Sequence, residues 1–290
     1  MKIAVLGASG VIGRAIVAEL ARTHDVVAVA RRPGQAAQGV QWLSADLSDA
    51  GDAERALAGT DVAVHLVHSL GSADFENLDL TIARNVARAA EQAGLSQIVY
   101  LGGLGDESPA LSKHLLSRLE TAKALARGKV PVTTLRAGMV VGAGSAAFET
   151  IVALVNRLPA MICPRWVSVP TQPIALKDVV SYLSGVIGLE ATYGETYDVG
   201  GLEVMTYRSM IDRIARIRGK HPLIVEVPVL TPRLSSWWLH LVTPVKASVA
   251  RPLIDGLRNP TVVRDDRIRS LVPIPLASFD DAVREALRAD

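Results

Sequence analysis

Residues Lys2 to Gly13, Lys-Ile-Ala-Val-Leu-Gly-Ala-Ser-Gly-Val-Ile-Gly, join a short apolar run to a glycine-rich turn. The run at residues 3–6 has the composition of a buried strand, and a helical pattern begins directly after the turn. A strand that turns on glycines into a helix leaves free backbone N–H groups at the positive end of the helix dipole, where a pyrophosphate can bind. Gly7 would allow the tight turn, Gly10 the approach of the phosphates, and Gly13 the close packing of helix on strand. The stretch therefore predicts a dinucleotide site in preference to a plain structural turn.

The composition is that of a globular protein with a large core. The chain has 290 residues, of which 49% are hydrophobic and 21% charged, and its net charge is +2. This balance provides no field that would attract nucleic acid. A single cysteine, Cys163, excludes an intrachain disulfide, and no group of His, Asp and Glu has metal-ligand spacing. We expect no metal and no nucleic-acid partner.

The same features suggest where the protein works. One cysteine fits a reducing cytoplasm, and the N-terminal apolar run is too short and too rich in glycine for a signal peptide. No apolar stretch approaches the roughly 20 residues that a membrane span requires. We therefore expect a cytoplasmic protein without a membrane span.

Strand-like apolar runs alternate with helical patterns through the first two-thirds of the chain. The expected strands are residues 3–6, 26–30, 40–43, 61–67, 97–101, 132–135 and 197–199, and the expected helices are 11–22, 73–94, 111–128 and 176–189. Strands separated by helices of this length imply right-handed crossovers and a parallel sheet covered on both faces. The predicted fold is α/β, a Rossmann-type doubly wound parallel sheet with a smaller C-terminal substrate lobe.

The character of the chain changes near residue 143, where prolines become frequent. We expect residues 1–142 and 176–200 to form the NAD(P)-binding domain. Residues 143–175 and 201–290 would form a smaller lobe over the carboxyl edge of the sheet, facing a substrate or a partner. Trp237 and Trp238 lie in this lobe, either in its core or as part of an apolar pocket or partner-facing patch.

The end of the second expected strand indicates which dinucleotide binds. In an NAD site that strand usually ends in Asp or Glu, which holds the ribose hydroxyls. Here it ends in Arg31 and Arg32, and Arg14 follows the third glycine of the loop. Guanidinium groups can hold a phosphate with paired hydrogen bonds. A solvated basic loop is the alternative, but the position favours recognition of the 2′-phosphate, and hence NADP over NAD.

Two further strand ends should border the dinucleotide. Asp46 and Leu47 follow the third strand, where the adenine is expected, and Val67 and His68 end the fourth, which should pass the ribose. His68 by itself could equally be a loop residue. The complete set of expected cofactor contacts is Gly7, Ser9, Gly10, Val11, Ile12, Gly13, Arg31, Arg32, Asp46, Leu47, Val67 and His68.

The chain resembles the short-chain dehydrogenase/reductase superfamily, in its extended or atypical branch. The resemblance lies in Gly7-Ala-Ser-Gly-Val-Ile-Gly13, in Asn85-Val-Ala-Arg-Ala-Ala-Glu-Gln-Ala-Gly94 before Ile98-Val-Tyr-Leu101, in Leu135-Arg-Ala-Gly-Met-Val-Val-Gly142 and in Pro173-Ile-Ala-Leu-Lys-Asp-Val179. These motifs cover roughly the first 200 residues. The nearest look-alikes are NmrA-like proteins and the NAD(P)H-binding relatives of a complex I accessory subunit. The resemblance implies a Rossmann-type domain that binds NAD(P)H.

Superfamily members that act as dehydrogenases use a serine after the fifth strand and Tyr-x-x-x-Lys on the next helix. The tyrosine exchanges a proton with the carbonyl oxygen, and the lysine lowers its pKa and holds the nicotinamide ribose. In this chain the fifth strand runs into Gly102 and Gly103, and His114 and Arg118 stand where the tyrosine and lysine would be expected. The Ser-Tyr-Lys set is therefore expected to be absent.

His114 and Arg118 admit two interpretations. His114 could be a catalytic proton donor tuned near neutral pH, with Arg118 orienting the ribose or a phosphate. Alternatively the two are an exposed helix pair without a catalytic role. Hydride transfer does not require the missing set, because the proton can come from water or substrate while the protein orients the cofactor.

The substrate side is expected to combine the loop after the sixth strand with the lobe. Met139 is a candidate pocket wall, and Phe148, Arg165 and Trp166 would converge above the nicotinamide. Arg165 could bind an anionic group or be an ordinary surface arginine, and Trp166 could be a core residue.

Two functions from different classes fit these features. The first is an NADP(H)-dependent oxidoreductase for a small hydrophobic substrate, without the Ser-Tyr-Lys set. The second is a non-catalytic NADP(H)-binding regulator or assembly factor with a protein partner. The intact glycine loop and the elaborated lobe favour the first, and the departures at Gly102, Gly103 and His114 favour the second.

Overall fold

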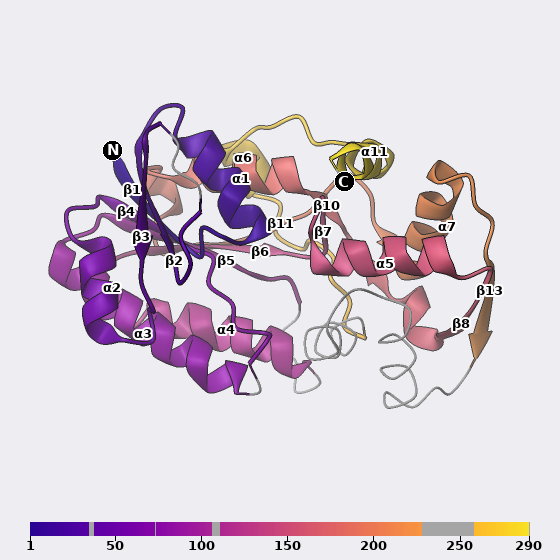
Figure 1. Cartoon of the computed structure of the whole chain (residues 1–290), viewed down its shortest axis with the longest axis horizontal. Coiled ribbons are helices and arrows are strands. Elements are labelled where there is room, and N and C mark those ends of the chain that lie inside the picture. The colour runs from indigo at the N-terminus through magenta and orange to yellow at the C-terminus, as the bar shows by residue number, and fades with distance from the viewer. Residues whose placement is uncertain (35–37, 73, 106–110, 228–257, 290) are drawn as a thin grey trace.

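A seven-stranded parallel sheet forms the centre of the molecule. The computed structural model describes residues 1–34, 38–72, 74–105, 111–227 and 258–289, and Figure 1 shows the whole chain. The strand order is β11-β6-β5-β4-β1-β2-β3, and every neighbouring pair is parallel. The strands are β1 (Lys2–Leu6), β2 (Asp25–Ala30), β3 (Val40–Ser44), β4 (Val62–His65), β5 (Gln97–Gly103), β6 (Val132–Ala137) and β11 (Thr196–Val199). The order reverses between β1 and β4, which is where ligands bind in such sheets.

Helices cover both faces of this sheet, which confirms the doubly wound prediction. On one face lie α1 (Val11–Leu20) and α6 (Leu176–Val186), and on the other α2 (Ala50–Leu57), α3 (Phe75–Ala93) and α4 (Lys113–Leu125). The strands are apolar on both sides because both sides are buried. In β1, for example, Ile3 and Val5 pack in the core under α1 and α6, whereas Ala4 and Leu6 pack in the core toward α2 and α3.

The two helices that flank the candidate site have clear local end signals. The Ser112 side chain accepts a hydrogen bond from the Leu115 amide and starts α4. Helix α3 stops at Gly94, whose φ of +69° is the left-handed conformation that glycine adopts without strain. Gly94 is the stop that the sequence predicts.

The C-terminal part of the chain adds a third apolar core beside the carboxyl ends of the strands. Phe148, Met210, Ile214 and Val283 are among its buried members. Its helices are α5 (Ala146–Arg157), α7 (Tyr207–Ile217), α11 (Phe279–Arg288) and the short η1 (Arg165–Ser168). Its strands form the parallel pairs β8 (Ala160–Pro164) with β13 (Leu223–Val227) and β7 (Val140–Val141) with β10 (Ile174–Ala175), and the antiparallel pair β9 (Pro170–Thr171) with β12 (Met205–Thr206). Elsewhere the chain forms the short helices η2 (Glu190–Thr192) and α10 (Ile268–Leu271), and Ile268 of α10 packs in the core under α1 and α6. Figure 1 shows α5, α7 and α11 at one end of the sheet.

A buried carboxylate holds a late segment of the chain against the sheet. Asp198 in β11 lies 2.7 Å from Nη2 of Arg136 in β6, and its other oxygen accepts the backbone N–H of Arg264 at 3.0 Å. Because Asp198 is buried and fully paired, this contact fixes the path of the segment. Thr261 in that segment thereby pairs with Thr171, with 2.6 Å between their hydroxyl oxygens. The segment is brought to the carboxyl end of the sheet.

Within the described ranges, no helix has the length and apolar character needed to cross a membrane.

Candidate functional site

The turn between β1 and α1 has the geometry of an anion cradle. Gly7 has a φ of +88°, and a Cβ there would lie 3.1 Å from the Leu66 carbonyl carbon. A Cβ at Gly13 would lie 2.3 Å from the Gly7 carbonyl oxygen. Gly10 caps α1 without a side-chain hydrogen bond, so the first amides of the helix are left for a ligand. This turn fits the pyrophosphate of a dinucleotide.

The arginines that follow β2 are exposed to solvent beside this turn. Arg31 and Arg32 are both exposed, and Ser44 Oγ donates to the Arg31 carbonyl at 3.1 Å. Hydrogen bonds from the Ser48 hydroxyl and amide lower the pKa of Asp46, and the positive charge of Arg31 adds to this effect. Arg31 and Asp46 therefore border the same region, as expected of residues near the adenosine part of a dinucleotide.

The segment after β3 is held in place by α3. The Asn85 side-chain amide donates to the carbonyls of Leu47 at 3.1 Å and Ser48 at 2.9 Å. The side chain of Leu47 is buried. Asn85 thus fixes the backbone on which Asp46 and Leu47 lie.

A cavity of about 320 Å³ connects the glycine loop to the lobe. Ile12 of α1 lines it, together with His68, His114 and Met139. Tyr207 and Thr261 close the lobe side. The structure therefore brings a residue of the cofactor loop, the histidine expected where the family has tyrosine, and a predicted substrate contact to one space.

Of the other predicted substrate residues, Phe148 does not line this cavity. Phe148 is 1% exposed and packs in the core of the lobe, because its position in α5 faces α7. Arg165 and Trp166 have their backbone in η1, and their side chains lie outside the described part of the structure, as do Trp237 and Trp238 entirely. For these residues a substrate role stays a prediction.

Two histidines and a carboxylate form a hydrogen-bonded series at the cavity. His68 Nδ1 lies 2.9 Å from Asp79 Oδ2, and His68 Nε2 lies 3.1 Å from His114 Nδ1. The other carboxylate oxygen of Asp79 accepts the Ser69 amide at 2.9 Å. Asp79 itself is 3% exposed. The series runs from a buried carboxylate to the cavity wall.

Burial keeps both histidines neutral. It lowers the pKa of His114 to about 3, with further lowering by His68 and by the positive charge of Arg118. Burial and Arg118 also lower the pKa of His68, although Asp79 acts in the opposite direction. Burial raises the pKa of Asp79, but hydrogen bonds from His68 and Ser69 outweigh it, so the net shift is downward. At pH 7 the series contains one ionised carboxylate and two neutral imidazoles.

Arg118 lines the same cavity as the histidines and also links α4 to β5. Its guanidinium donates to the Leu101 carbonyl and lies 5.3 Å from the centre of the Tyr100 ring. The Tyr100 hydroxyl donates to the Arg118 carbonyl at 3.1 Å. These contacts use the guanidinium as a structural link between β5 and α4.

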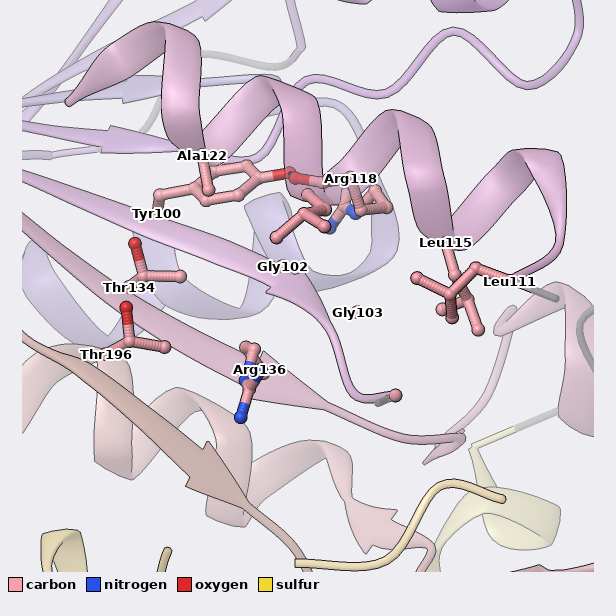
Figure 2. Close-up of a pocket in the computed structure, with 12 residues that line it drawn as sticks. Tyr100, Gly102, Gly103, Leu111, Leu115, Arg118, Ala122, Thr134, Arg136 and Thr196 are labelled. Carbon is pink, nitrogen blue, oxygen red and sulfur yellow. Dashed lines mark hydrogen bonds between the residues drawn. The ribbon is translucent and has the colours of Figure 1, made fainter. Parts of the chain in front are cut away.

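A second cavity, of about 260 Å³, shares Gly102, Gly103, Leu115 and Arg118 with the first. Figure 2 shows the Tyr100 ring of β5 beside Arg118 of α4, the glycines of β5 below them, and Thr134 and Arg136 on the neighbouring strand β6. A Cβ at Gly103 would lie 2.8 Å from Leu115 Cδ2. A serine at this position would require Leu115 to move.

The buried histidines make stability depend on pH. His65, 1% exposed, is a third member, and burial lowers its pKa to about 3. Each such histidine takes up a proton near pH 6.5 in the unfolded chain but stays neutral in the fold, so the stability is complete above pH 6.5 and declines as the pH falls toward 3. We expect urea unfolding to show a loss approaching about 1.4 kcal/mol per pH unit for each histidine in this window. His65→Leu should reduce that slope by one proton, and an unchanged slope would contradict the assignment.

Sequence reasoning missed Asp79, Tyr207 and Thr261. A signal for Asp79 was present: it lies four residues after Phe75 and three before Ile82, on the buried face of α3, where a carboxylate needs a partner. Tyr207 and Thr261 carry no comparable local signal.

Comparison with known proteins identifies the first part of the chain. Residues 7–141 match the model of a family described as NAD(P)H-binding. This part of the chain is an NAD(P)H-binding domain. The dinucleotide expectation drawn from the glycine loop is thereby confirmed.

Two curated relatives differ in how much they share with this chain. An uncharacterized protein of Mycobacterium tuberculosis is 40% identical over 102 residues, which make up 34% of this chain and 12% of that protein. The shared region is thus a small part of the relative. A (4-alkanoyl-5-oxo-2,5-dihydrofuran-3-yl)methyl phosphate reductase of Streptomyces griseus is 25% identical over 222 residues, 75% of this chain and 74% of the reductase.

Solved structures with the same fold carry different cofactors and names. A nucleoside-diphosphate-sugar epimerase from Staphylococcus aureus has a TM-score of 0.78 and 17% identity, covering 98% of this chain and 100% of the epimerase. An NADPH-dependent quinone oxidoreductase from Escherichia coli, complexed with NADPH, has a TM-score of 0.78 and 23% identity, covering 98% and 99%. A Bordetella bronchiseptica enzyme in complex with NAD has a TM-score of 0.74 and 17% identity, covering 99% and 93%. These likenesses show the fold, and the reaction has to be argued from the site.

Proposed function

We propose that this protein is an NADP(H)-dependent oxidoreductase that acts on a small hydrophobic molecule in the cavity between the glycine loop and the lobe. One observation carries the proposal: a single space is lined by Ile12 from the cofactor loop, by the paired histidines and by the lobe residue Tyr207. An enzyme of this type has to bring cofactor, proton-transfer group and substrate wall together.

The choice of NADP(H) over NAD(H) rests on the end of β2. Arg31 and Arg32 stand there, both exposed, in place of the acidic residue that holds the ribose hydroxyls in NAD sites. An NADPH-bound quinone oxidoreductase shares the fold, and so does an enzyme with NAD bound. The arginines therefore supply the argument that the fold alone does not.

The bound dinucleotide would supply or accept a hydride, and the chain's own groups would do the rest. The glycine loop and the free amides of α1 would hold the pyrophosphate, and Asp46 and Leu47 would border the adenine. His114 would contact the reacting oxygen. Arg118, tied to the Leu101 carbonyl, would hold α4 in register with β5, and its charge would add to the burial that keeps the histidines neutral.

The lobe formed by residues 143–175 and 201–290 would provide the substrate wall. Met139, Ala146, Ala147 and Tyr207 line the cavity and offer mainly apolar surface. Such a wall suits a hydrophobic substrate, which gains affinity from the apolar surface that it buries. The Streptomyces griseus relative is named as a reductase, which agrees with this chemistry.

Filling the cavity tests this assignment. Ala146 lies on the cavity wall at the start of α5 and is half-buried. Ala146→Trp is expected to abolish NADPH oxidation with a panel of quinones, enones and ketones, while the affinity for NADPH changes less than about twofold. Ala58→Trp, at an exposed position after α2, is the control and should keep full turnover. Undiminished turnover in Ala146→Trp would place the reaction elsewhere.

A further inference from the structure

The position of each proton in the histidine series follows from its buried end. Asp79 is ionised, because its hydrogen bonds hold its pKa below the usual range. A carboxylate only accepts hydrogen bonds, so His68 Nδ1 must carry the proton that faces it at 2.9 Å. In a neutral imidazole the other nitrogen is then bare, so His68 Nε2 accepts from His114 Nδ1 at 3.1 Å. By the same rule, His114 Nε2 has no proton.

The bare nitrogen of His114 is available to a ligand. His114 lines the cavity, and within the described residues its Nε2 has no hydrogen-bond partner. The three groups follow one another in a line and do not converge, and no metal-binding group of His, Cys, Asp or Glu occurs in the part of the chain that the structure describes. The series therefore ends in an acceptor that faces the substrate space.

We propose that Asp79 and His68 position His114 as a proton acceptor for a substrate hydroxyl group, so that the substrate pair is a hydrophobic secondary alcohol and its ketone. This inference rests on the proposed oxidoreductase function and specifies its substrate class. A neutral donor–acceptor series with one direction discriminates between ligands, because a hydroxyl can donate to His114 Nε2 and a carbonyl oxygen cannot.

Oxidation of the alcohol by NADP⁺ would move one hydride and one proton. The substrate C–H bond breaks with its electron pair leaving as hydride to NADP⁺, and a C=O bond forms as the hydroxyl proton moves to His114 Nε2. His114 Nδ1 passes its own proton to His68 Nε2, and His68 becomes a cation paired with the Asp79 carboxylate. The positive charge is thereby moved from the cavity wall to a buried counter-ion, where charge-assisted hydrogen bonds are strong. Reduction of the ketone is the reverse of these steps.

Asp79 is a positioning residue, because it acts through His68. Its Oδ1 accepts the Ser69 amide and its Oδ2 faces His68. In Asp79→Asn the Ser69 amide would keep the amide oxygen on its own side, and the NH₂ group would then face His68 Nδ1 as a donor. His68 would change tautomer and donate to His114 Nδ1, and His114 Nε2 would become protonated. One substitution is thus expected to reverse the whole series.

Histidine ¹⁵N NMR spectra of the cofactor-free protein at pH 7 test the direction of the series. In the wild type, His114 Nε2 should give the resonance of an unprotonated nitrogen, and in Asp79→Asn that of a protonated one. Ser117→Ala is the control, because Ser117 Oγ lies 3.5 Å from Asp79 Oδ2 and does not set a tautomer. A protonated His114 Nε2 in the wild type would overturn the inference, whether or not the variant folds.

Turnover of secondary alcohols with NADP⁺ tests the role. Asp79→Asn is expected to reduce kcat by at least about 100-fold, with KM for NADP⁺ unchanged, since the acceptor has become a donor. Asp79→Glu should restore part of the rate. Unchanged kcat in a variant whose tautomers are reversed would overturn the acceptor role alone. If the wild type turned over no alcohol, ketone, quinone or enone, the proposed oxidoreductase function itself would be contradicted.

Discussion

Replacing Gly13 by alanine is expected to abolish NADP(H) binding. A Cβ at this position would lie 2.3 Å from the Gly7 carbonyl oxygen and 2.8 Å from the Ala8 Cα, and both are backbone atoms that no rotamer change can move aside. Helix α1 would have to shift off β1, and the amides that hold the pyrophosphate would move with it. We expect calorimetric titration to show at least about a 100-fold rise in the Kd for NADPH, or about 2.7 kcal/mol.

A second glycine provides the matched control. A Cβ at Gly71 would meet nothing within 4 Å, and its φ is not positive. Gly71→Ala should therefore bind NADPH like the wild type. Thermal unfolding of both variants separates loss of the site from loss of the fold. If Gly13→Ala bound NADPH with wild-type affinity, the turn between β1 and α1 would not be the pyrophosphate site.

Removing both arginines after β2 is expected to remove the preference for NADPH. Arg31 and Arg32 would contact the 2′-phosphate, and hydrogen bonds to a charged group contribute about 1.5–3 kcal/mol each. The double variant Arg31→Ala/Arg32→Ala should bind NADPH about 100-fold more weakly, while its affinity for NADH changes little. Calorimetric titration with both nucleotides measures the two effects on one protein.

A variant of a distant arginine and a change in salt concentration serve as controls for this affinity measurement. Arg88 is an exposed arginine on α3 at the far side of the sheet from α1, so Arg88→Ala should leave both affinities unchanged. The NADPH preference should weaken as ionic strength rises, because exposed charges are screened. Equal affinity of the wild type for NADPH and NADH would show that the arginines do not recognise the phosphate.

The fold was predictable because its signals are local. Strands such as β1 and β2 are short runs of mainly apolar residues, bounded by glycines or polar residues. In helix α3, the spacing of the apolar residues predicts the buried face, and Gly94 predicts the end of the helix. The elements missed, among them α2, α7 and α11, are short or lie where prolines interrupt the pattern.

The site was predictable only in part, because its contacts are long-range. His68 and His114 are 46 residues apart, and nothing in either neighbourhood indicates that their rings meet. The sequence signals at the two positions are separate: the resemblance to the superfamily places a tyrosine at the expected position of His114, and His68 ends an expected strand. Their connection depends on how α4 packs against α3 and β5. Their tautomers depend on Asp79, which a sequence pattern shows only as a polar residue on an apolar helix face.

Hydride transfer itself is the most direct test of the proposed oxidoreductase. The protein would be mixed, without oxygen, with NADPH carrying deuterium at nicotinamide C4 on one face or the other, together with a hydrophobic ketone, enone or quinone. We expect the product of a carbon-centred reduction to contain one deuterium, delivered from only one of the two labelled faces. Tight NADPH binding with no deuterium in any ketone or enone product, and with no oxidation of NADPH by a quinone, would contradict the account and indicate a nucleotide-binding regulator instead.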